Sequence, residues 1–96
     1  MADEAREKRG EERVATAMPV RIENFTGITR DVSATGIFFE TEATFSPGSA
    51  IRFVVEIDAD SRRKILRCQG TIVRVENRNS LLGVAVKILD ARMEAV

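Results

Sequence analysis

Hydrophobic and polar residues alternate along most of this chain once a charged N-terminal segment has ended. Alternation of this kind places every second side chain on one face of a β-strand. The pattern is clearest over residues 51–57, where Ile51, Phe53, Val55 and Ile57 fall on a single face. The same criterion predicts six strands, which run over residues 18–25, 28–33, 37–41, 51–57, 65–75 and 82–88.

Short polar segments separate the predicted strands. Ser46-Pro47-Gly48 is a strong turn signal, because proline fixes φ and glycine tolerates positive φ. Turns are also predicted over residues 24–27, 58–64 and 77–80. Gly70 lies inside the longest predicted strand, where a glycine often marks a bulge or a sharp bend.

Six short strands joined by tight turns predict an all-β fold, as an antiparallel barrel or a sandwich. A barrel is favoured because closure removes open edges in a domain too small for two well-covered layers. We expect the barrel over residues 14–96, with Phe38, Phe39 and Phe53 in its core. Residues 90–96 could add one or two helical turns or fray.

Residues 1–13 differ from the rest of the chain, because they contain many charges and no large apolar side chain. We expect a flexible arm that becomes ordered only when something binds it. The arm carries Arg9 and Arg13, four residues apart. Alone, such a pair in a charged tail is most simply interpreted as solvated.

The charges of the 96 residues balance, with fifteen basic and fifteen acidic side chains. A zero net charge argues against a polycation built for bulk DNA or RNA. Only Lys8, Lys64 and Lys87 of the fifteen basic residues are lysine. The remaining arginines suit phosphate and guanine edges. A genomic bias toward arginine explains the composition equally well.

The chain has no histidine and one cysteine, Cys68. Zinc, copper and iron sites are therefore disfavoured, and no cofactor is expected. Cys68 falls in an apolar run and is expected in the core rather than as a nucleophile. No apolar stretch approaches the roughly 20 residues of a membrane-spanning helix. We expect a protein of the reducing cytoplasm with no membrane insertion.

A second motif follows the arm. Asp31-Val32-Ser33-Ala34-Thr35-Gly36 places a carboxylate, a hydroxyl and a glycine between two apolar runs. Alone, this motif is most simply a turn, because Asp and Ser cap turns with their own side chains. Together with Arg9 and Arg13 it suits a ligand that carries both phosphate and hydrogen-bonding bases, which points to a nucleotide.

In order and spacing, the two motifs resemble those of the PilZ domain, a bacterial receptor module for the second messenger cyclic di-GMP. That family carries Arg-x-x-x-Arg in a flexible N-terminal arm and Asp/Asn-x-Ser-x-x-Gly on its barrel. The resemblance covers about residues 8–90. It includes the segments from Gly70 to Val75 and from Leu82 to Ile88, which are similar to the family's fifth and final strands.

The resemblance implies a six-stranded β-barrel, usually with a C-terminal helix, and a receptor that signals to an unidentified protein partner when its arm changes conformation. The arginines would hold phosphate and purine, and Asp31 would accept from the guanine N1–H and N2–H₂ groups. In the family, an arginine at the position of Lys8 is associated with the binding of two intercalated ligand molecules. With lysine there, the number of ligand molecules per chain, one or two, stays open. The ligand-binding residues would be Lys8, Arg9, Arg13, Asp31, Ser33 and Gly36.

Three other functions compete with this interpretation. The first is a PilZ-like interaction domain that does not use the nucleotide, although such members usually lack one of the two motifs and this chain keeps both. A nucleic-acid-binding barrel would stack bases on exposed aromatic side chains, but the chain has five Phe and no Tyr or Trp. An enzyme is least favoured, because acid–base chemistry would fall to carboxylates alone. Asp58 and Asp60, on a predicted loop, should not affect binding.

Overall fold

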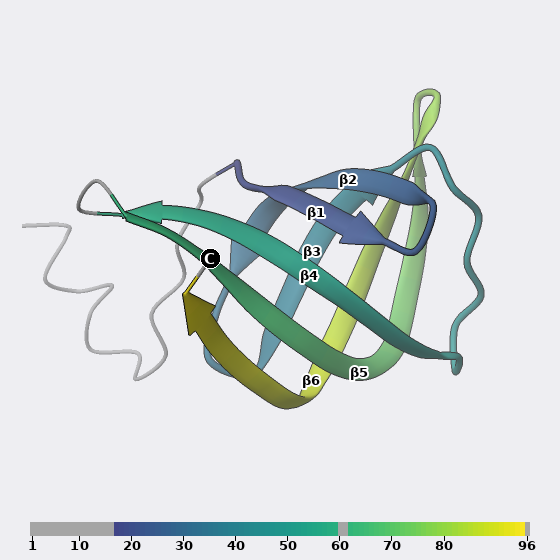
Figure 1. Cartoon of the computed structure of the whole chain (residues 1–96). Helices are drawn as coiled ribbons and strands as arrows, with labels where there is room; N and C mark the ends of the chain where they lie inside the picture. The colour runs from purple at the N-terminus through teal and green to yellow at the C-terminus, as the bar shows by residue number, and fades with distance from the viewer. Residues whose placement is uncertain (1–16, 60–61, 96) are drawn as a thin grey trace, which may run out of the picture.

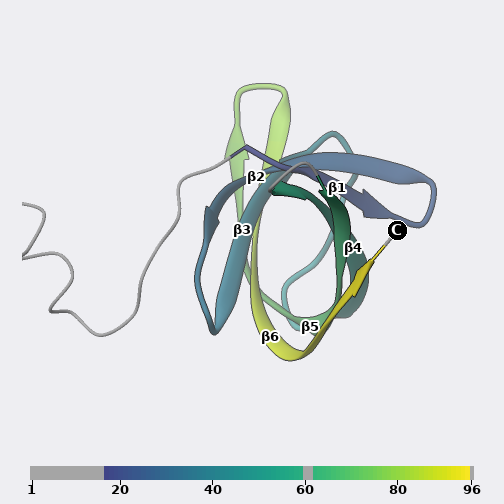
Figure 2. The ribbon, with the colours of Figure 1, turned by 60° about the vertical axis from the view of Figure 1, so that its left-hand side comes forward.

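The computed structural model describes residues 17–59 and 62–95, which form an all-β structure. Its six strands are β1 (Pro19–Ile22), β2 (Phe25–Val32), β3 (Gly36–Thr41), β4 (Ala50–Ala59), β5 (Arg62–Arg78) and β6 (Leu81–Ala95). They close into a barrel in the order β1-β2-β3-β6-β5-β4, and every neighbouring pair is antiparallel (Figures 1 and 2). The predicted six-stranded antiparallel barrel is confirmed.

Inward-facing apolar side chains from β1, β3, β4, β5 and β6 form one core, and the half-buried Val32 of β2 packs against it. The rings of Phe39 and Phe53 meet at its centre, with centroids 5.7 Å apart and planes tilted by 47°. Phe38 was expected in this core, but it is only half-buried because it points outward from β3. The buried cluster consists of Val20, Ile22, Ile37, Phe39, Ile51, Phe53, Val55, Cys68, Ile72, Val84 and Val86.

Three β-bulges interrupt the ladders between strands. Arg30 of β2 has no partner in β3, because Thr29 pairs with Phe39 and Asp31 with Phe38. Val73 of β5 and Leu89 of β6 are skipped in the same way where β5 pairs with β6. Val73 is 56% exposed and Leu89 is 63% exposed. Each bulge leaves one residue outside the alternation, so the residues beyond it change face.

Two turns lie elsewhere than the sequence suggested. The first turn is Glu23-Asn24, not residues 24–27, and Ile22 pairs directly with Phe25 across it. Gly27 is instead buried within β2. The polar segment 58–64 was predicted as a loop, but β4 continues to Ala59 and β5 begins at Arg62. Backbone pairing between the strands outweighs the polar composition of this segment.

The chain does not turn into a helix after residue 90. Instead β6 continues to Ala95, as the long curved strand that ends at the C label in Figure 1. Its last part pairs with β5, from Gln69 opposite Asp90 to Lys64 opposite Ala95. Arg67 and Glu94 add an ion pair at 3.2 Å across this ladder. The ladder satisfies backbone groups that a short terminal helix would leave open.

We expect Gly70→Ala to destabilise the barrel. A Cβ at Gly70 would lie 2.2 Å from the carbonyl oxygen of Lys87, which is backbone and cannot swing aside. Overpacking of this kind costs roughly 1–3 kcal/mol of unfolding free energy. Urea denaturation would measure the loss, with the exposed neighbour Gln69→Ala as the control. Equal stability of the two variants would contradict the close packing of β5 against β6.

Candidate functional site

The motif that starts at Asp31 forms the connection between β2 and β3. The Ser33 N–H donates to the Gly36 carbonyl oxygen at 2.9 Å, and the Gly36 N–H donates to Ser33 Oγ at 3.2 Å. A Cβ on Gly36 would lie 3.0 Å from the Val86 carbonyl oxygen of β6. Ser33 and Gly36 therefore shape the turn and its contact with β6.

Asp31 lies on the outer face of the barrel because of the bulge at Arg30. Without that bulge, Asp31 would share the inward face of Thr29, which is fully buried. Instead Asp31 is half-buried and pairs across the ladder with Phe38. Within residues 17–59 and 62–95, its carboxylate makes no hydrogen bond or ion pair. It is thus available to a ligand.

A continuous row of side chains crosses four strands on this outer face. Asp31 of β2 is opposite Phe38 of β3, Phe38 is opposite Ala85 of β6, and Ala85 is opposite Arg74 of β5. The bulge at Val73 places Arg74 here, since simple alternation would give Arg74 the inward face of Ile72. Two register shifts therefore bring a carboxylate and a guanidinium to the same face.

Two arginines lie over the ring of Phe38. The guanidinium carbon of Arg74 is 5.8 Å from the ring centroid and that of Arg78 is 5.5 Å away. Each arginine also contacts a carboxylate, with Arg74 Nε 2.9 Å from Glu76 Oε2 and Arg78 Nε 3.0 Å from Glu40 Oε2. The Arg74–Glu76 pair is solvent-exposed, and such pairs contribute only about 0–1 kcal/mol, so the Arg74 guanidinium can be redirected at little cost. Arg78 is held more firmly, because the Glu40 side chain is only 15% exposed.

These residues border a pocket of about 310 Å³ over the end of the β2–β3 turn. Its polar groups are the carboxylates of Asp31 and Glu76, the hydroxyls of Ser33 and Thr35 and the guanidinium groups of Arg74 and Arg78. We call it the motif pocket. It offers donors for an anion, an acceptor for base N–H groups and a flat surface for stacking.

The structure brings together only half of the predicted site. Asp31, Ser33 and Gly36 all line the motif pocket. Lys8, Arg9 and Arg13 lie outside the described residues, so their part in a site stays a prediction.

Sequence reasoning missed Phe38, Arg74 and Arg78. The one sequence signal for any of these three residues was the segment from Gly70 to Val75, which contains Arg74. Simple alternation from Ile72 would place Arg74 on the inward face, because the bulge at Val73 leaves no trace in the pattern. Phe38 was assigned to the core because it stands in an unbroken apolar run with Ile37 and Phe39.

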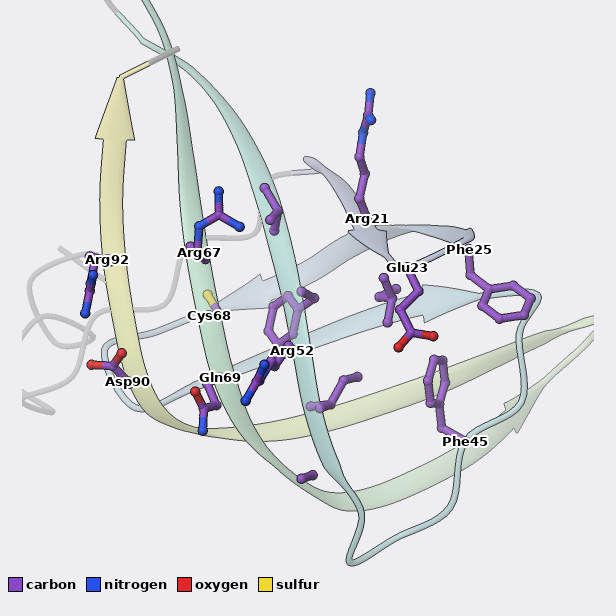
Figure 3. Close-up of a pocket in the computed structure, with 15 residues that line it drawn as sticks. Arg21, Glu23, Phe25, Phe45, Arg52, Arg67, Cys68, Gln69, Asp90 and Arg92 are labelled. Carbon is purple, nitrogen blue, oxygen red and sulfur yellow. The ribbon is translucent and has the colours of Figure 1, made fainter.

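A larger pocket of about 880 Å³ lies elsewhere on the barrel, where β1 and β4 share only two residue pairs (Figure 3). Phe25 and Phe45 stand at one end of it, and Arg52 points into it from β4 (Figure 3). The motif residues that the structure describes, Asp31, Ser33 and Gly36, do not line it. Its charges are mixed, with Glu23 and Asp90 among the arginines, so it does not select a clear ligand class.

Cys68 has no catalytic environment. Its side chain is 2% exposed, and burial raises the pKa of the Cys68 thiol to about 11. Among the residues that the structure describes, no cluster of acidic and thiol side chains could hold a metal ion. In the same part of the chain, no helix has the length and hydropathy needed to cross a membrane.

Comparisons with known proteins agree with this fold. A family model described as the PilZ domain matches residues 7–96. The structure of the Bacillus subtilis inhibitor of motility (MotI/DgrA) is similar, with a TM-score of 0.76 and 14% sequence identity over 88% of this chain. The match covers 44% of that protein, so this chain spans less than half of its length. No curated protein sequence matches this chain.

We expect the Cys68 thiol to react slowly with a disulfide reagent at pH 8, because little thiolate forms so far below a pKa of about 11. Folding raises this pKa above its ordinary value of 9.0, so the stability contributed by the protonated thiol is complete below pH 9 and is lost as the pH rises toward 11. Absorbance would follow the reaction with and without urea, and equal rates would contradict the burial.

Proposed function

Because the chain belongs to the PilZ domain family, we propose that it is a receptor for cyclic di-GMP that passes the signal to a protein partner. PilZ domains are receptor and adaptor modules rather than enzymes. The observation that carries the proposal is the convergence of Asp31, Phe38 and Arg74 on one outer face beside the motif turn.

The chemistry of the motif pocket suits a guanine nucleotide. Asp31 has no competing partner among the described residues, and a carboxylate can accept both the N1–H and the N2–H₂ of guanine. The Arg74 guanidinium can donate to phosphate oxygens or to guanine O6 and N7, as bidentate arginine contacts do. The Phe38 ring and its arginines add a flat surface for a purine.

The motif pocket can enclose only part of a cyclic dinucleotide. Its volume of about 310 Å³ is near the lower limit for small-molecule sites. We propose that Arg9 and Arg13, with Lys8, supply the remaining contacts from the N-terminal side. The family match begins at residue 7 and thus includes all three residues. Ordering such a segment costs free energy, so we expect an affinity in the micromolar range.

A change in the protein surface would pass the signal to the partner. A bound ligand would bring residues 8–13 and the β2–β3 turn into one surface, which a protein partner could distinguish from the free form. We propose that this takes place in the bacterial cytoplasm, where cyclic di-GMP acts as a second messenger.

One observation favours a second candidate, a PilZ-like interaction domain that does not bind the nucleotide. The two arginines at the motif pocket are already neutralised by Glu76 and Glu40, and the Ser33 hydroxyl already closes the turn. The face could then serve a protein partner directly. A partner captured equally by the wild type and by Arg13→Ala, with no heat of nucleotide binding, would favour this function.

We expect Arg9→Ala, Arg13→Ala and Asp31→Ala each to weaken cyclic di-GMP binding by roughly 10–150-fold, because a charge-assisted contact contributes about 1.5–3 kcal/mol. Isothermal titration calorimetry would give both affinity and stoichiometry, with GTP as the ligand control. Asp58→Ala is the matched control, since the Asp58 side chain is 84% exposed and remote from the motif pocket. No binding by the wild type at about 100 μM ligand would exclude the receptor function.

Arg74→Ala tests the part of the site that the structure added. We expect a loss of roughly tenfold or more in affinity, because one charge-assisted contact is removed. Arg52→Ala is the arginine control, since it is exposed on β4 and lines the other pocket. If Arg74→Ala binds like Arg52→Ala while Asp31→Ala does not bind, the ligand contacts β2 without reaching β5.

A further inference from the structure

Among residues 17–59 and 62–95, the last part of β6 has a neighbouring strand on one side only. Its pairing with β3 ends where Gly36 meets Lys87, and the Ile88 N–H then donates to the Thr35 carbonyl oxygen at 2.9 Å. From Leu89 to Ala95 it pairs with β5 alone among the described residues. Alternate backbone N–H and C=O groups of this stretch therefore face outward at an open edge.

This edge lacks two of the features that normally prevent strand addition. Open edges are usually protected by proline, by charged side chains and above all lysine, by bulges or by a covering element. The stretch from Leu89 to Ala95 contains neither proline nor lysine, but Leu89 forms a bulge and three charged side chains follow it. Two of its large apolar side chains are exposed, Leu89 at 63% and Met93 at 53%. The charges of the stretch therefore decide which strand can pair with it.

The charges along the edge are complementary to themselves. Asp90 and Arg92 stand two residues apart on β6 and line the pocket of Figure 3 together with Arg67 and Gln69 of β5. Both are exposed, and neither makes an ion pair within the described residues. Glu94, in contrast, is held by Arg67 of β5 at 3.2 Å. One acid and one base two residues apart therefore remain available to a partner strand.

Self-pairing of this edge has one register that the charges favour. In an antiparallel pair of identical strands, residues opposite each other share a face. With Ala91 opposite Ala91, each Asp90 lies opposite an Arg92, twice in the dimer. With Arg92 opposite Arg92, like charges meet and Asp90 faces Glu94. With Met93 opposite Met93, Arg92 would lie opposite Glu94, but Glu94 is already paired with Arg67. Opposite-charge pairs stabilise a sheet and like charges destabilise it, so the first register is favoured.

We propose that two copies of this chain form a dimer by antiparallel pairing of their β6 edges, with Ala91 on the two-fold axis. The β4-β5-β6 sheets of the two barrels then form one continuous sheet. The partner at this edge is a second copy because the edge matches its own charge pattern. Asp31, Phe38 and Arg74 lie over the earlier part of β6 at Ala85, so the dimer leaves the motif pocket open.

Charge exchange tests the register. We expect the wild type to dimerise in sedimentation equilibrium, and Asp90→Arg or Arg92→Asp to raise the dissociation constant roughly tenfold or more, because each creates two like-charge pairs. The double variant restores both attractions and should dimerise like the wild type. Circular dichroism would check that each variant keeps its fold. A monomeric wild type, or a double variant as weak as the singles, would overturn the proposal.

Cross-linking tests the axis. Opposed residues in antiparallel strands have Cα atoms about 4.5–5.5 Å apart, within reach of a disulfide. We expect Ala91→Cys to form a disulfide-linked dimer under mild oxidation. The matched control is Ala95→Cys, which is exposed on the same strand but lies opposite residue 87 in this register. Wild-type Cys68 is 2% exposed and should stay unlinked. Equal cross-linking of the two variants would contradict the register.

Discussion

The barrel rests on one constraint, which is that a closed sheet has a single interior that every strand must fill with apolar side chains. Where strict alternation would send the wrong residue inside, the chain inserts a bulge. Arg30, Val73 and Leu89 are the residues left out of the ladders. All three are exposed, so the unpaired residue of each bulge lies at the surface and not in the core.

The same bulges create the outer face on which the proposed function depends. Without them, Asp31 and Arg74 would belong to the inward faces of their strands, where an unpaired charge is strongly unfavourable. With them, the two charges lie on either side of Phe38 on the surface. Fold and site are therefore not separable, since removing a bulge would both expose apolar residues and bury the charges.

Alternation and turn chemistry predicted the strands, their number and the closed barrel, because burial of one face leaves a period-two trace in the sequence. The same rules wrongly assigned Phe38 to the core and gave no role to Arg74. A bulge depends on the register of the neighbouring strand, which no local pattern contains. The extension of β6 beyond residue 90 could not be predicted from the sequence either, because pairing with β5 rather than local propensity determines this strand. Asp31, Ser33 and Gly36 were predicted as site residues from a motif and not from periodicity.

The hydrogen bonds between Ser33 and Gly36 have a consequence for how such motifs are interpreted. These two residues are needed to fold the turn whether or not a ligand ever arrives. A relative that had lost its ligand would still be under selection to keep them. The diagnostic weight of the motif therefore rests on Asp31, whose carboxylate does nothing for the described part of the fold. A motif search that gives Asp31, Ser33 and Gly36 equal weight would therefore count two residues that shape the turn as evidence of ligand binding.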